Sequence, residues 1–285
     1  MREYADAEGI GMDKDLNGRV QSVDRAMTLL EALGEQEGGQ RLTDLARRTK
    51  LSLTTVHRLL TTLEQRHFVQ FSSGDNLWHI GRQAYATGSA FVRDRHFVAP
   101  ALPFLKRLRD LTRETANLGV VDSGEIVVVN QVESREITRA VSRVGGRTPM
   151  TASGMGKAIL SCYSDYDVTD LVDRCGMRKV TSRTITTRQD LDADLARTRQ
   201  AGYSVDNEEF STNLRCVAAA VFDNQQEVVC AISVSGLPSR MHPDRMPALG
   251  RLVAHTAAEL TFALGGTLPP QVAGGRKCLE SVQQC

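Results

Sequence analysis

Two groups of residues in this chain of 285 residues have the types and spacing to bind other molecules. The first group lies on a predicted helix over residues 52–65, where apolar residues recur at helical spacing from Leu53 to Leu63. In a helix-turn-helix, the second helix enters the major groove and its N-terminal side chains contact bases. The predicted DNA-contacting residues are basic or hydroxyl-bearing: Arg41, Ser52, Thr54, Thr55, His57, Arg58 and Thr61.

Positive charge is concentrated around this predicted helix. Between Arg41 and Arg66, six Arg or Lys residues stand against Asp44 and Glu64, a local balance of +4, whereas the whole chain has a formal net charge of +1. A basic patch beside a groove-reading helix is the electrostatic signature of DNA binding. A helical hairpin used for protein contacts, with an ordinary solvated charged face, is the alternative that this pattern leaves open.

The second group is centred on the segment TASGMGK at residues 151–157, which precedes an apolar helix. Backbone N–H groups at a helix N-terminus attract anions. The segment lacks the four-residue spacer of the GxxxxGK[ST] phosphate loop. Ser153 also lacks the glycine two residues earlier that a nucleophile elbow requires. A carboxylate therefore fits this segment better than a nucleoside triphosphate.

Residues farther along the chain could complete a pocket with this segment. Ser233 and Ser235 alternate on a predicted strand, so both hydroxyls face one side. Cys216 begins another apolar strand, and Asp206 lies in an acidic segment over 206–209 that is predicted to be a loop. Each residue also has an ordinary structural explanation, because serine is common on strand faces and cysteine is a common core residue.

Catalytic and metal-binding arrangements are not predicted. The six histidines show no HExxH spacing, and the six cysteines form no CxxC pair. We therefore expect no enzyme activity, no cofactor and no metal site. The polar, acidic N-terminus does not resemble a signal peptide, and the chain has no apolar run of membrane-spanning length. These features predict a cytoplasmic protein with reduced thiols and no membrane partner.

The elements that must position these groups fall into two parts. In the first, predicted helices over 20–34 and 42–49 precede the groove-reading helix. Two alternating runs, 69–72 and 77–80, follow it and are joined by the turn residues 74–76. This order of elements is that of a winged helix-turn-helix, and a further helix leads out of it.

The second part mixes strands and helices without regular βαβ alternation. This order of predicted elements indicates an α+β domain, with an antiparallel sheet and flanking helices. The predicted strands cover residues 117–122, 125–132, 138–143, 216–222 and 228–235. A final helix is predicted over about 244–264.

Taken together, these motifs resemble the IclR-type transcriptional regulators over about residues 18–265. Within that family the likeness is greatest to the glyoxylate-shunt and allantoin-pathway repressors. The resemblance rests on LTTVHRLL at 53–60, WHIG at 78–81, ASGMGKA at 152–158, LRC at 214–216 and ISVSG at 232–236.

The resemblance implies a repressor that binds an operator in double-stranded DNA as a homodimer or homotetramer. It implies a GAF-like effector domain that binds a small carboxylate such as glyoxylate or pyruvate, with Asp206 accepting from a hydroxyl or hydrated carbonyl. The implied ligand-binding residues are the Ser-Gly-x-Gly turn, polar strand residues and an apolar patch: Ser153, Gly154, Met155, Gly156, Asp206, Cys216, Ser233, Ser235, Ile137, Ala140 and Leu214.

Two departures from the close relatives alter the expected pocket. Met155 stands where those relatives have Ala, and Ala140 stands where a larger apolar residue is usual. The expected organisation is a disordered arm over 1–18, a winged helix-turn-helix over 19–81, a linker and dimerisation helix over 82–98, an effector-binding domain over 99–265 and a flexible tail over 266–285. Two alternatives remain at this point: a DNA-binding protein whose second domain only oligomerises, and an enzyme acting on small acids.

Overall fold

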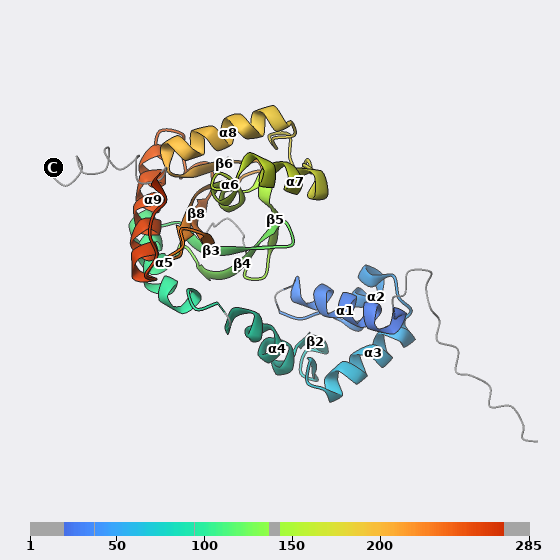
Figure 1. Ribbon diagram of the computed structural model, residues 1–285. Helices are drawn as coiled ribbons and strands as arrows, with labels where there is room; N and C mark the ends of the chain where they lie inside the picture. The colour runs from blue at the N-terminus through green and yellow to red at the C-terminus, as the bar shows by residue number, and fades with distance from the viewer. Residues whose placement is uncertain (1–19, 37, 94, 137–142, 271–285) are drawn as a thin grey trace, which may run out of the picture. The chain divides into compact units, whose positions relative to one another are not determined.

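The computed structural model describes residues 20–36, 38–93, 95–136 and 143–270 (Figure 1). The chain divides into two compact units between residues 94 and 95. The predicted arm over 1–18 and most of the predicted strand over 138–143 lie outside the described residues.

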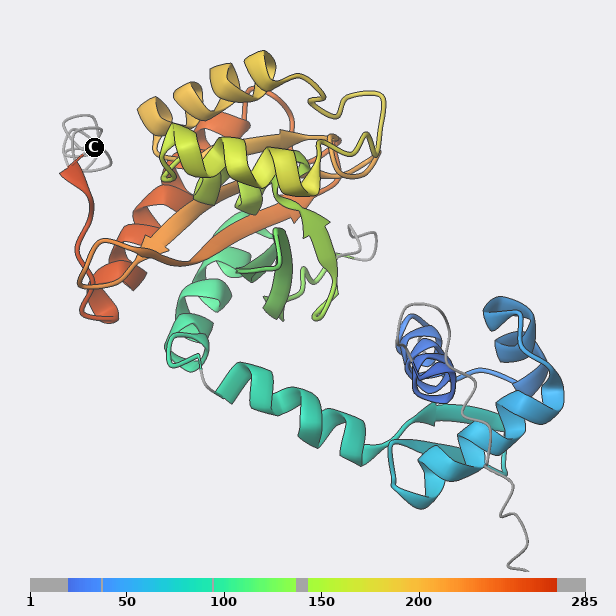
Figure 2. The same ribbon diagram turned by 45° about the vertical axis from the view of Figure 1, so that its right-hand side comes forward.

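The first unit is a winged helix-turn-helix, as the sequence predicts. A two-stranded antiparallel hairpin, the wing, follows three helices, and a further helix follows the hairpin (Figure 2). The elements are α1 Gln21–Gly34, α2 Leu42–Thr49, α3 Leu53–Gln65, β1 Val69–Ser72, β2 Leu77–Ile80 and α4 Arg82–Arg93.

The connector between α2 and α3 is only three residues long, because each helix end is fixed locally. Lys50 ends α2 in the left-handed conformation, with φ at 55°. Ser52 caps α3, since its side chain accepts a hydrogen bond from the Thr55 amide at 3.2 Å. These two residues set the turn that fixes how α3 packs on α2.

The core of this unit lies between the three helices and the wing. Leu29 of α1, Leu45 of α2, Leu60 of α3 and Trp78 of β2 are buried together. Burying each such side chain contributes about 1.5–3 kcal/mol. Leu53, which the sequence pattern places in the same stripe, is 50% exposed. That prediction is wrong because Leu53 is the first residue of α3 and lies beyond the edge of the core.

The second unit is an α+β domain, which confirms the predicted fold class. Its six-stranded sheet has the order β5-β4-β3-β8-β7-β6, and every neighbouring pair is antiparallel. The strands are β3 Thr115–Asp122, β4 Glu125–Val132, β5 Arg147–Pro149, β6 Ser204–Asn207, β7 Arg215–Phe222 and β8 Val228–Gly236. The helices are α5 Val98–Thr112, α6 Gly154–Leu160, α7 Asp165–Cys175, α8 Arg188–Ala201 and α9 Met246–Ala263, with a short 3₁₀ turn at Met150–Ala152.

Helices cover the two faces of this sheet differently. The paired helices α5 and α9 pack on one face, and α6 packs on the other, with α8 against α6 (Figure 1). Because successive strand residues point to opposite faces, Val217 and Ile232 face α9 whereas Cys216 and Ser233 face α6. The α6 face therefore carries the polar residues.

One sequence expectation for this unit is wrong. Asp206 was expected in a loop, but Asp206 and Asn207 lie in β6 and pair with β7. The alternation of Ser204, Val205 and Asp206 is that of a strand, and the carboxylate of Asp206 is buried rather than solvated. Among the described residues, no helix is long and apolar enough to span a membrane.

Candidate functional sites

The predicted DNA-contacting residues lie on the outer side of α3 and just before α2. Thr54, His57 and Arg58 are exposed on α3, and Thr55 and Thr61 of the same helix are half-buried. Arg41 and Ser52, which immediately precede α2 and α3, are exposed as well. This side of α3 is thus available for contact, as a groove-reading helix requires.

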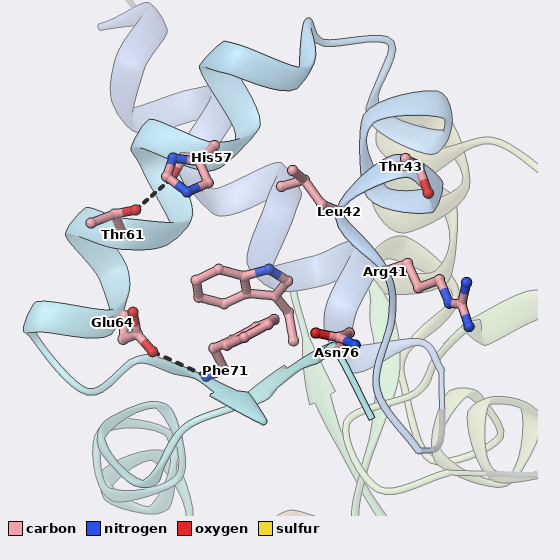
Figure 3. Close-up of a pocket in the computed structure, with 9 residues that line it drawn as sticks. Arg41, Leu42, Thr43, His57, Thr61, Glu64, Phe71 and Asn76 are labelled. Atoms are coloured by element: carbon pink, nitrogen blue, oxygen red, sulfur yellow. Dashed lines mark hydrogen bonds between the residues drawn. The ribbon is translucent and has the colours of Figure 1, made fainter. Parts of the chain in front are cut away.

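Three of these residues also line a hollow of about 560 Å³ between α3, the start of α2 and the wing (Figure 3). They are Arg41, His57 and Thr61, and the wing contributes Asn76 to the same hollow. Phe71 and Trp78 form its aromatic base, with ring centroids 5.1 Å apart. Asn76 is not among the DNA-contacting residues predicted from the sequence, although it lies within the turn signal between the two strands of the wing.

The hydroxyl groups on α3 differ in how much hydrogen-bonding capacity they retain. Ser52 Oγ caps the helix and lies 2.9 Å from Thr55 Oγ1. Thr61 Oγ1 donates to the His57 carbonyl at 2.9 Å (Figure 3). Thr54 makes no side-chain hydrogen bond to the described residues, so its hydroxyl keeps its full capacity for an added partner.

The basic residues of this unit also divide into two sets. Arg47 pairs with Asp44 at 2.7 Å. Arg48 pairs with Glu35 and donates to the buried Gln40 side chain at 3.0 Å, so Arg48 supports the fold. Among the described residues from 41 to 66, the positive charges without an ion-pair partner are those of Arg41, Lys50, Arg58 and Arg66.

In the second unit, the predicted polar ligand residues form a row across three strands on the α6 face. Asp206 of β6 lies opposite Cys216 of β7, and Cys216 lies opposite Ser235 of β8. Ser233 lies two residues along β8 on the same face, opposite Asn117 of β3. All five side chains are buried. The row brings together residues that are up to 118 positions apart in the sequence.

The glycine-containing segment lies directly over this row. Ser153 caps α6, since its hydroxyl accepts from the Gly156 amide at 3.1 Å. A β-carbon at Gly154 would lie 3.0 Å from the Cys216 sulfur, so glycine lets α6 approach β7 closely. Met155 in turn packs over Gly119 of β3. The start of α6 and the polar row thus enclose one buried region.

Two further side chains of this region were not foreseen from the sequence. Asn117 Nδ2 lies 3.2 Å from Ser233 Oγ and 3.0 Å from Ser235 Oγ. Gln131 Nε2 of β4 lies 2.8 Å from Asn117 Oδ1. The sequence signal for Asn117 and Gln131 is weak, because each is simply a polar residue within a largely apolar strand.

A buried ion pair joins α6 to the segment after β6. Lys157 Nζ lies 2.7 Å from a Glu209 carboxylate oxygen and 2.9 Å from Asp194 Oδ2. Burial alone would lower the pKa of Lys157, but the two carboxylates outweigh it and raise that pKa. Lys157 is therefore charged, and it serves this pair rather than a phosphate.

The electrostatics of the polar row favour uncharged forms. Burial, aided by the charge of Glu209, raises the pKa of Asp206 to about 7. Burial and the charge of Asp206 raise the pKa of Cys216 to about 12, so this thiol stays protonated at neutral pH. Below about pH 7 both Asp206 and Cys216 are protonated and uncharged, so the row can accept an added anion.

The remaining predicted ligand residues lie partly outside the described chain. Leu214 is buried and precedes β7, two residues from Cys216, whereas Ile137 and Ala140 lie outside the described residues. The described residues hold no cluster of metal-ligating side chains. A hollow of about 630 Å³ lies elsewhere in this unit, between α8, α9 and the β7–β8 turn. None of the residues of the polar row lines it.

A winged helix-turn-helix whose exposed groove-reading helix α3 lies within a locally basic region defines the chain as a DNA-binding protein. Known protein families match both units of the chain. Residues 22–73 match the IclR helix-turn-helix domain, and residues 89–261 match the C-terminal domain of the bacterial transcriptional regulator IclR. The chain belongs to the IclR family of bacterial transcriptional regulators.

Individual relatives agree with this assignment. The chain is 41% identical over 251 residues to the transcriptional repressor IclR of Escherichia coli K12, covering 87% of this chain and 92% of that protein. It is 40% identical over 254 residues to the acetate operon repressor of Salmonella typhimurium LT2, covering 88% and 93%. The crystal structure of Thermotoga maritima IclR, 24% identical, superposes with a TM-score of 0.73 over 87% of this chain and 100% of that one.

Proposed function

We propose that this protein is a transcriptional repressor whose affinity for its operator is set by a small carboxylate such as glyoxylate or pyruvate. The observation that carries the proposal is the buried row of Asp206, Cys216 and Ser235 beneath the start of α6. Polar groups are rarely buried without a reason, because each must recover the hydrogen bonds it loses to water. The names of the two bacterial relatives, both repressors, support the sign of regulation.

The donors that would hold the carboxylate lie on β8 and at the start of α6. Ser233 and Ser235 supply hydroxyls. The Gly156 amide already donates to Ser153, which leaves the amides of Gly154 and Met155 as the donors in the first turn of α6. Protonated Asp206 would supply a further donor. The close packing of Met155 and Cys216 against the glycines supports an acid of two to four carbons rather than an aromatic one.

On the DNA side, α3 would read bases, with Thr54, His57 and Arg58 as the central contacts. Arg41 and the wing would contact the backbone. A two-fold protein pairs with a palindromic operator, so a dimer or a dimer of dimers is expected. Exposed apolar residues of the first unit support such an assembly, since Val23 of α1 is 55% exposed and Tyr85 of α4 is 79% exposed.

Regulation requires that the ligand bind the DNA-competent and DNA-incompetent states unequally. In this proposal residues 99–265 are the effector domain, and α4, within residues 82–98, links it to the winged helix. A ligand seated between α6 and the sheet would bias the position of α6 and of the Lys157–Glu209 pair. The two units would then respond together through the linker.

Isothermal titration calorimetry of the full-length protein tests this proposal. Acetate, glyoxylate and pyruvate are titrated in turn, with pyruvamide as the matched neutral control. The proposal predicts saturable one-site binding of at least one acid and weaker binding of the amide. If none of the acids binds while the same preparation retains DNA binding, the second unit is not a carboxylate sensor of this kind.

A further inference from the structure

We infer that Asn117 and Gln131 set the hydrogen-bond polarity of the ligand site, so that the serine hydroxyls of β8 donate to a carboxylate. Neither side chain belongs to the ligand set implied by the resemblance. Both are positioning residues, since they act through Ser233 and Ser235. The inference rests on the proposed function, because it specifies how the same site distinguishes an anion from a neutral analogue.

The contacts form a continuous chain across three strands. Gln131 Nε2 on β4 donates to Asn117 Oδ1 on β3 at 2.8 Å. Asn117 Nδ2 donates to Ser233 Oγ at 3.2 Å and to Ser235 Oγ at 3.0 Å on β8. Register supports the chain, because Gln131, Asn117 and Ser233 are directly opposite one another. Asn117 and both serines are buried, so water does not compete for the bonds between them, whereas Gln131 is half-buried.

The direction of these bonds decides what the serines offer to a ligand. A side-chain amide has two N–H donors on nitrogen, and both protons of Asn117 are directed at the two serines. Each serine oxygen therefore accepts one bond, and its single proton remains for another acceptor. Within the site, the acceptors that would take these protons are the oxygens of a bound carboxylate, with the Cys216 sulfur also in reach of Ser233.

Gln131 fixes this direction. Because its N–H group points at Asn117, the amide of Asn117 must present its oxygen to β4 and its nitrogen to β8. With the amide reversed, the serines would donate to Asn117 and present only lone pairs to the ligand. Chains of hydrogen bonds polarise one another in a buried environment, so each donor strengthens the next. The chain thus favours a carboxylate over an amide or an alcohol.

The test is a double-mutant cycle in the full-length protein, read by calorimetry with pyruvate and glyoxylate. Asn117→Leu removes the connecting amide at similar volume. Gln131→Glu replaces the donor that faces Asn117 by an acceptor, which reverses the Asn117 amide. Each single variant is expected to bind pyruvate about tenfold more weakly, the scale of one buried hydrogen bond to a charged group. The double variant should bind no more weakly than Asn117→Leu alone, since Gln131 acts through Asn117.

Asn130→Asp is the matched control. It introduces the same charge one residue from Gln131, on the opposite face of β4, and keeps the side-chain oxygen that accepts from the backbone N–H of Gln131 at 2.7 Å. This variant should bind pyruvate as the wild type does and should keep the wild-type preference for pyruvate over pyruvamide, whereas Gln131→Glu should narrow that preference. Unchanged DNA binding without ligand verifies the fold of each variant, and Asn117→Ala replaces Asn117→Leu in the cycle if the leucine is not accommodated.

The possible results separate this inference from the proposed function. If the wild-type protein binds the acids and the affinity losses of the two single variants multiply in the double variant, the charge of Gln131→Glu acts directly on the ligand. The hydrogen-bond chain from Gln131 through Asn117 is then refuted. The same holds if neither single variant weakens binding. If the wild type binds neither acid, the proposed function itself fails, and this inference fails with it.

Discussion

Asp206 of β6 and Cys216 of β7 lie directly opposite each other on the face of the sheet that α6 covers. Burial brings the pKa of the carboxylic acid up to about 7 and that of the thiol up to about 12. The pair is therefore an acid that titrates near neutrality beside a thiol that does not titrate in the physiological range.

Anion binding should weaken as the pH rises through about 7, the raised pKa of Asp206. Below that value Asp206 is protonated and donates to the ligand, whereas above it the carboxylate repels the ligand. Lys157, Glu209 and Asp194 are the other charged groups that face this region, and burial raises the pKa of Glu209 too, despite its pairing with Lys157. The Asp206→Asn variant therefore decides which of the two carboxylates produces the slope. Calorimetry with pyruvate between pH 6 and pH 8 measures the slope, and Asp206→Asn should abolish it. An Asp206→Asn variant that retains the wild-type slope would refute this assignment.

The buried ion pair of Lys157 and Glu209 predicts a large effect on stability. Lys157→Met removes one charge and leaves the buried Glu209 carboxylate without its ion-pair partner, whereas Asp194 keeps its pairing with Arg197 at 2.7 Å. This change should cost about 3–5 kcal/mol of unfolding free energy. Urea denaturation monitored by circular dichroism measures this loss. Lys179→Met, at an exposed position after α7, is the matched control and should change stability by less than about 0.5 kcal/mol. Equal effects of the two variants would show that the pair contributes nothing to folding.

Arg58 on the exposed side of α3 should be a main determinant of operator affinity. Arg58→Ala should weaken specific binding by about 1–3 kcal/mol if the side chain reads a base, and the salt dependence should change little. Mobility-shift titrations at several salt concentrations distinguish this outcome from loss of a phosphate contact, which lowers the salt slope. Arg174→Ala, at an exposed position of α7 in the other unit, provides the control. Wild-type affinity of Arg58→Ala would place base recognition elsewhere.

Ser52 allows the capping role and the DNA-binding role of one residue to be separated. Ser52→Ala should lower the stability of the first unit by about 1 kcal/mol, because the Thr55 amide loses its acceptor. Ser52→Asp preserves the cap, so it should be as stable as the wild type, yet its charge should oppose the approach of phosphate. Thermal unfolding and mobility-shift titration of both variants provide the two measurements. Strong operator binding by Ser52→Asp would exclude Ser52 from the DNA interface.

Much of the fold could be predicted from the sequence because local signals agree with one another. The helical spacing of Val56, Leu60 and Leu63 identifies a buried helix face, and all three are buried. The alternation of Ser233 and Ser235 predicts that they share one face of a strand, as they do. Leu53 shows the limit of the pattern, since periodicity does not reveal where the core ends.

The rest of the candidate site depends on tertiary register, which no local pattern specifies. Asn117 contacts two serines more than 110 positions away only because β3 pairs with β8 in one register. Lys157 finds Glu209 and Asp194 because α6 packs against β6 and α8. The buried acid at Asp206 could not be distinguished from a solvated loop residue without its partner strand.

The most direct test of the central claim is a titration of the operator complex with pyruvate and glyoxylate, comparing the wild type with the Ser233→Ala/Ser235→Ala double variant. If the polar row is an effector site, at least one acid should change the operator affinity of the wild type. The double variant should bind the operator equally well without ligand and should not respond to the acid. An identical response of the two proteins, or a wild type whose operator affinity no small acid alters, would contradict it.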